Sequence, residues 1–144
     1  MNKTFWFLFL ALTTIAFGQN KEKEIFVKLI DQPILIDGDL SENIWEEAFK
    51  TAEFQQYFPS DSILAKQKTS VKMLYDQVNL YLGVKVYTSG NDFIIPSLQR
   101  DFRAGNNDNI SFIFDTFNDG TNAFLFGINP LGVRREALIS NGGA

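Results

Sequence analysis

The chain has 144 residues, a formal net charge of −4, and neither cysteine nor histidine. Without these two residue types it cannot contain a Ser-His-Asp triad, a Cys-His pair, a disulfide or an ordinary transition-metal site. Its acidic balance also argues against binding nucleic acid, because phosphate groups attract clustered Lys and Arg.

The N-terminus is typical of a secretory signal peptide. Lys3 precedes an uninterrupted apolar run from Phe5 to Leu12, and the small residues Ala16 and Gly18 stand where a cleavage site requires them. We predict a signal peptide over residues 1–18, with a retained N-terminal anchor as the alternative. A charged linker is predicted over residues 19–32. The protein is expected to be exported to the periplasm, the outer membrane or the cell surface.

A short strand and a short helix are predicted next. Residues 34–36 are Ile-Leu-Ile, and Asp37 and Gly38 begin a turn that ends this strand. Ser41 is a suitable N-cap for a helix that runs to about Lys50. Asp37 and Gly38 are therefore assigned a structural role in the turn.

Trp45 is predicted to be buried and structural. It lies with Ile44 and Ala48 on one face of the expected helix, and large aromatic side chains mostly contribute buried area. A further strand is expected over residues 54–58, stopped by Pro59.

Alternating apolar residues predict β-hairpins in the rest of the chain. The expected strands cover residues 69–75, 80–87, 110–114, 124–128 and 133–140. The turn Asn118-Asp119-Gly120 reverses the second hairpin. Residues 95–100 are expected to form one helical turn.

Four residues are candidates for binding a ligand. Tyr81 and Tyr87 share one face of their strand, opposite a row of Leu and Val side chains. If that face is open, they form an aromatic platform for sugar rings; if it is covered, they are core residues. Arg134 and Arg135 could donate paired hydrogen bonds to sugar hydroxyls, with an edge-strand salt bridge as the equal alternative.

Acidic residues offer one candidate cation site. Asp101 and Asp108 lie in a loop with Asn106 and Asn109, and these oxygen ligands suit Ca²⁺. The alternative, which we favour, is ordinary polar loop composition, and no other cofactor is expected. The carboxylates show no spacing typical of a glycosidase pair, so catalysis by this chain is not indicated.

The predicted fold is all-β. About seven strands and one short N-terminal helix predict an antiparallel, jelly-roll-like β-sandwich over residues 33–144. The chain ends in Asn141-Gly-Gly-Ala144, which is turn chemistry. We therefore expect the sandwich to be incomplete at its C-terminus.

Several segments resemble the family 9 carbohydrate-binding-module-like domains. Ile36-Asp-Gly-Asp-Leu-Ser-Glu-Asn-Ile-Trp45 resembles the opening motif of this family, and the run from Val71 to Tyr87 is similar to its paired second and third strands. Arg100-Asp101, the segment from Asp108 to Phe117 and Asn129-Pro-x-Gly132 resemble a subgroup found at the N-terminus of large exported, outer-membrane-associated bacterial proteins. The resemblance covers about residues 33–143.

The resemblance implies a β-sandwich that binds polysaccharides or oligosaccharides and is often attached to glycoside hydrolases. Modules of family 9 clamp a terminal sugar between two Trp rings, whereas Trp45 is the one Trp left after residue 18. The expected function is a non-catalytic carbohydrate-binding module of a larger protein, with a downstream domain of the same chain as its partner. The alternatives are a structural or docking sandwich without sugar binding, or part of a glycoside hydrolase.

Overall fold

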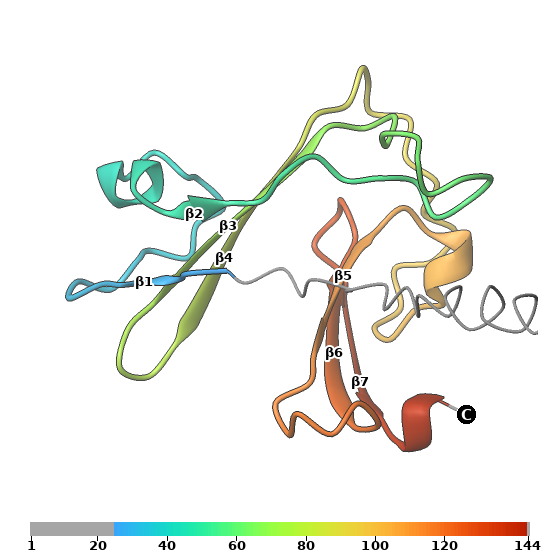
Figure 1. The fold of residues 1–144 in the computed structure, drawn as a ribbon. Helices are drawn as coiled ribbons and strands as arrows, with labels where there is room; N and C mark the ends of the chain where they lie inside the picture. The colour runs from blue at the N-terminus through green and yellow to red at the C-terminus, as the bar shows by residue number, and fades with distance from the viewer. Residues whose placement is uncertain (1–24, 144) are drawn as a thin grey trace, which may run out of the picture. The chain divides into compact units, whose positions relative to one another are not determined.

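A computed structural model describes residues 25–143, so the signal peptide expected over residues 1–18 lies outside the described part (Figure 1). The described residues are rich in strands, which form two sheets, and their helical pieces are short 3-10 turns. The all-β prediction is confirmed at this level. The contacts divide this part of the chain between Tyr87 and Thr88 into two units with one sheet each.

The first unit is built around strand β3 (Thr69–Tyr75). Strand β4 (Leu80–Val86) pairs with it antiparallel along all seven residues. Two short strands share the other edge of β3: β1 (Lys28–Leu29) pairs parallel and β2 (Phe49–Lys50) pairs antiparallel. The hairpin predicted by the alternating pattern is therefore present, with its turn at residues 76–79.

One face of this sheet is covered by the N-terminal segment. The core there consists of Ile30, Ile34, Trp45, Leu74 and Tyr81, which are at most 8% exposed. The 3-10 turn η1 (Asn43–Glu46) places Trp45 over Gly83 of β4, where the glycine leaves room for the indole ring. Trp45 is 3% exposed, which agrees with the expected burial.

Several expected elements of the first unit are wrong. The helix expected from Ser41 to about Lys50 is only the four-residue turn η1, which Glu42 precedes without a side-chain cap. Phe49 and Lys50 instead join β3 as β2, because their backbone finds partners on its edge.

Residues 34–36, where a strand was expected, have irregular backbone, and Ile34 is buried in the core. In the turn that follows, the Asp37 carboxylate accepts a 2.8 Å hydrogen bond from the Asp39 N–H, and Gly38 has a positive φ. The expected linker of residues 19–32 contains β1 and the buried Ile30.

The second unit is a three-stranded antiparallel meander. Its strands are β5 (Ile110–Phe114), β6 (Ala123–Ile128) and β7 (Arg134–Ile139), in that order. Asp115 and Asp119 accept backbone N–H bonds in the β5–β6 turn, where Asn118 and Gly120 have positive φ. The hairpin predicted there is present. The helical turn expected over residues 95–100 is absent, and a 3-10 turn η2 (Ala104–Asn106) follows instead.

Each sheet has one apolar face that its own unit leaves partly open. In the first unit this face carries Met73, Tyr75, Leu80, Leu82, Val84 and Val86, of which Leu80 is 49% exposed. In the second unit it carries Ile110, Phe112, Phe114, Phe124, Phe126, Ile128 and Leu138, of which Phe126 is 47% exposed.

Within residues 25–143, no helix is long and apolar enough to cross a membrane.

Candidate functional site

Two highly exposed aromatic side chains of the first unit sit at the tip of a short arm, residues 54–64, while the equally exposed Phe26 lies near the start of the described residues. The strand expected over residues 54–58 is reduced here to a single bridge between Gln55 and Leu64. The Gln56 N–H donates to the Ile63 carbonyl at 2.8 Å, and the Gln56 side chain donates to the Leu64 carbonyl at 3.1 Å. These bonds hold the two sides of the arm together.

The tip of the arm presents two consecutive aromatic residues. Tyr57 is 98% exposed and Phe58 is 82% exposed. Beside them, the hydroxyls of Ser60 and Ser62 lie 2.7 Å apart, and the Ser62 N–H donates to the Ser60 hydroxyl. Large apolar rings exposed to water cost free energy, so two of them on a hydrogen-bonded arm indicate a surface that contacts something.

A shallow hollow of about 80 Å³ lies at the base of the arm. Its lining includes the exposed side chains of Glu53, Lys66 and Lys68 together with Phe54 and Leu64. The hollow therefore combines charged hydrogen-bonding groups with apolar surface.

The backbone of Tyr87 is bonded to a residue that lines this hollow, although Tyr87 itself does not line it. Its N–H donates to the carbonyl of Lys68, a lining residue, at 2.9 Å. Its ring is 48% exposed, and Lys85 Nζ lies 5.5 Å from the ring centroid. We call Tyr57, Phe58, the hollow and Tyr87 together the arm surface. The sequence analysis identified Tyr87 as a candidate but did not identify the arm. Two consecutive aromatic residues between Gln-Gln and Pro-Ser-Asp-Ser, a composition typical of exposed turns, could have indicated it.

Of the two alternatives for Tyr81, the core role applies, and Tyr81 does not form an open platform with Tyr87. It is 8% exposed and belongs to the core of the first unit, because the Trp45 segment covers its side of β4. Its hydroxyl donates to Asp76 at 2.6 Å. This hydrogen bond, followed by those from the Val78 and Asn79 N–H groups, holds the pKa of Asp76 well below its ordinary value of 3.8. The same bond raises the pKa of Tyr81 above 10.0.

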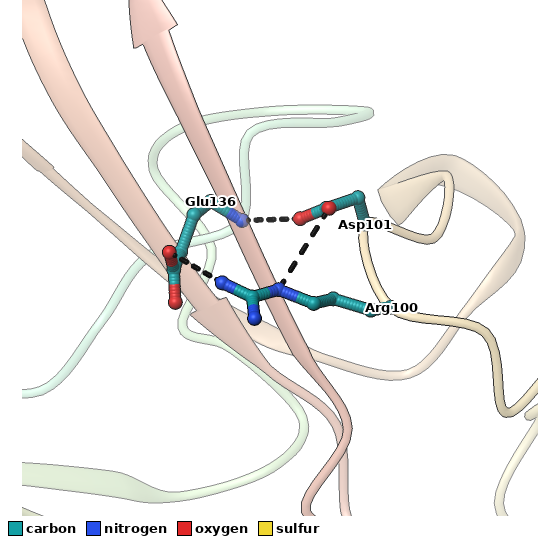
Figure 2. A network of polar contacts seen from close by, with 3 residues as sticks. All are labelled: Arg100, Asp101 and Glu136. Atoms are coloured by element: carbon teal, nitrogen blue, oxygen red, sulfur yellow. Dashed lines mark hydrogen bonds and ion pairs between the residues drawn. The ribbon is translucent and has the colours of Figure 1, made fainter.

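The candidate arginines separate in the structure. Arg134 and Arg135 are consecutive residues of β7, so their side chains leave opposite faces of the sheet. The ion pair at this strand is made by Arg100, whose Nη2 donates to Glu136 Oε2 at 2.8 Å (Figure 2). Among residues 25–143, neither Arg134 nor Arg135 forms the edge-strand salt bridge considered for them, and the ion pair of this strand comes from outside it.

Asp101 binds the open edge of β7. Its N–H donates to the Arg134 carbonyl at 3.0 Å, and its Oδ1 accepts the Glu136 N–H at 2.9 Å. Figure 2 shows this carboxylate next to the backbone of Glu136. Its Oδ2 lies 3.9 Å from Arg100 Nε. Asp101 adopts a positive φ of 60°, which allows main chain and side chain to reach the same strand.

The two aspartates considered for Ca²⁺ have other partners. Asp108 accepts the Ile94 N–H at 2.9 Å and donates its own N–H to the Ile94 carbonyl at 2.8 Å, which fastens the two ends of a loop. Asp101 is bonded to β7 as described. Among residues 25–143, no three acidic side chains gather closely enough to hold a metal ion.

No known protein family matches the chain, and no curated protein or solved structure matches it significantly. The resemblance to family 9 therefore rests on the sequence motifs alone.

Proposed function

We propose that the chain is a non-catalytic carbohydrate-binding module of a larger exported protein that binds or breaks down polysaccharide. The observation that carries this proposal is the arm surface, with Tyr57 98% and Phe58 82% exposed at the tip of an arm whose base holds a hollow lined by Lys66 and Lys68. The expected export signal and the resemblance to family 9 support the same assignment.

The chemistry of the arm surface suits a sugar ring. A pyranose has an apolar C–H face and a rim of hydroxyls. An aromatic ring packs against the first, and Ser, Lys and Glu side chains exchange hydrogen bonds with the second. A purely apolar partner would leave the hydrogen-bonding groups of Glu53 and Lys66 without partners.

A binding role without turnover is supported by the state of the carboxylates. Asp101, Asp108 and Asp115 each accept backbone N–H bonds that hold an edge, a loop or a turn. A glycosidase needs two carboxylates facing each other across the scissile bond. If the complete protein hydrolyses O-glycosyl bonds, we expect another domain to supply these groups.

For the fold, we propose the jelly-roll-like β-sandwich expected from the sequence. Each sheet carries one half-exposed apolar face, and such faces are normally covered by another layer. These faces also support the second candidate function, a structural or docking sandwich. In that case they contact a further domain of the same chain, and the protein binds no sugar.

Calorimetric titration of the full-length protein with xylo-, cello- and manno-oligosaccharides tests the proposal. We expect binding without release of reducing ends. Tyr57→Ala should weaken binding about tenfold or more, as for a central aromatic anchor, whereas Tyr57→Phe keeps the ring. Release of reducing ends would contradict a non-catalytic role, and failure to bind any glycan would favour the docking function.

A further inference from the structure

We infer that the arm surface binds along the interior of a polysaccharide chain and does not enclose a chain end. This inference rests on the proposed function, because it specifies which part of a glycan the same surface recognises.

The first argument is the openness of the aromatic tip. A site for a terminal sugar surrounds the ring with walls, and the walls cover its aromatic residues. Tyr57 is 98% exposed and Phe58 is 82% exposed, so neither ring is covered by neighbouring side chains of its unit. A ring this open can contact one face of a sugar while the glycan chain continues in both directions.

The second argument is the size of the hollow. Its volume of about 80 Å³ is well below the roughly 300 Å³ at which pockets begin to enclose a small ligand. The hollow can accept a hydroxyl or a hydroxymethyl group, but it cannot surround a whole pyranose. Its lining residues, such as Lys66 and Lys68, can therefore contact only the edge of a sugar.

The third argument is the separation of the contacts. From Phe54, which lines the hollow, to Tyr57 at the tip is three residues, or roughly 10 Å of extended backbone. This distance is longer than one pyranose ring is wide. A glycan that contacts both the hollow and Tyr57 at once must therefore contain several linked sugars. The affinity of the arm surface for a glycan should increase with the length of the glycan.

The test compares intact and chemically reduced oligosaccharides with the full-length protein. Borohydride converts the reducing-end sugar of xylohexaose or cellohexaose into an open-chain alditol and leaves the interior of the chain unchanged. We expect the reduced and intact hexasaccharides to bind within about twofold of each other, and the hexasaccharides to bind about tenfold or more tightly than the disaccharides. Loss of binding on reduction, or equal affinity for disaccharide and hexasaccharide, would overturn the inference.

Two variants separate this inference from the proposed function. Tyr57→Ala should remove the dependence on chain length, whereas Val78→Ala, an exposed apolar residue in the β3–β4 turn, should leave it unchanged. Both variants should melt like the unmodified protein, because exposed residues contribute little to stability. If the unmodified protein binds no hexasaccharide, the proposed function itself fails. If it binds and Tyr57→Ala binds equally well, only the assignment to the arm surface fails.

Discussion

Replacement of Gly83 by Ala tests the packing of the first unit at its tightest point. A Cβ atom at Gly83 would lie 2.8 Å from Cζ3 of Trp45 and 3.0 Å from Cδ2 of Leu40. The indole ring cannot retreat easily, because Trp45 is 3% exposed and packs among Ile30, Leu74 and other core residues. Overpacking of this kind costs about 1–3 kcal/mol.

A second effect opposes this cost. Ala reduces the freedom of the unfolded chain relative to Gly, which stabilises a protein by about 0.4–1 kcal/mol where the backbone and the space permit it. We therefore expect Gly83→Ala to lower the free energy of unfolding by about 1–2 kcal/mol. Gly90→Ala is the matched control, because a Cβ there meets nothing within 4 Å and its φ is ordinary. This control should be neutral or slightly stabilising.

Urea unfolding of the full-length protein, followed by far-ultraviolet circular dichroism, measures both variants. The Trp45→Leu background completes a double-mutant cycle. The smaller side chain should destabilise the protein by itself and should remove most of the additional cost of Gly83→Ala. Our reasoning would be refuted if Gly83→Ala were as stable as the unmodified protein, or if it cost the same in both backgrounds.

Three further predictions concern the polar contacts. Asp101→Ala should lower the free energy of unfolding by about 1–3 kcal/mol, because it removes the acceptor of the Glu136 N–H. Ala also lacks the short polar side chain that lets Asp and Asn adopt a positive φ. Asp101→Asn tolerates that φ and keeps an acceptor, so an equal loss of stability in both variants by chemical denaturation would contradict this role. The folded-state pKa of both Asp76 and Asp119 is lowered below 3.8. Their contribution to stability is therefore complete above pH 3.8 and is lost as the pH falls below it. The melting temperature of Asp76→Asn should depend less on pH between about pH 2 and 5 than that of the unmodified protein, and parallel curves would argue against the Tyr81 bond as a stabilising contact. Millimolar Ca²⁺ should leave the melting temperature unchanged, because Asp101 and Asp108 already accept backbone N–H bonds. A clear increase in melting temperature that EDTA reverses would instead support a calcium site at these residues.

The hairpins could be predicted from the sequence because their information is local. Alternation over residues 69–86 and 110–128 fixes extended backbone, and the residues between the strands fix the turns. Asp119, for example, accepts the N–H groups of Thr121 and Asn122 within its own turn. Such a turn needs no distant partner, so its signal is complete in a few residues.

The elements that were missed depend on distant partners. Strand β1 has only two residues, and it is a strand because Lys28 and Leu29 meet Leu74 and Tyr75 across more than forty residues of chain. No pattern of two residues could reveal that pairing. The helix expected to run to Lys50 failed for the same reason, since the edge of β3 offered its backbone better partners.

Only the Tyr87 part of the candidate site could be predicted from the sequence. Periodicity showed that Tyr81 and Tyr87 share a face, but it could not show that Trp45 covers the Tyr81 end of that face and leaves Tyr87 half exposed. Gly83 was a usable clue, because a glycine inside a strand often marks a close approach of another group. The arm was missed because exposure at a loop tip has no periodic signature.

The Asp101 contact also has a consequence for the order in which the second unit assembles. Strands β5, β6 and β7 are joined by short turns, so they can pair soon after their residues meet. The hydrogen bond between the Glu136 N–H and the Asp101 carboxylate closes a loop of 35 residues. Closing this loop costs conformational entropy, and the bond can offset that cost only after β7 has paired with β6. The segment around Asp101 is therefore expected to dock last and to detach first, and the Glu136 amide should exchange its hydrogen earlier than the amides that link β6 to its two neighbours.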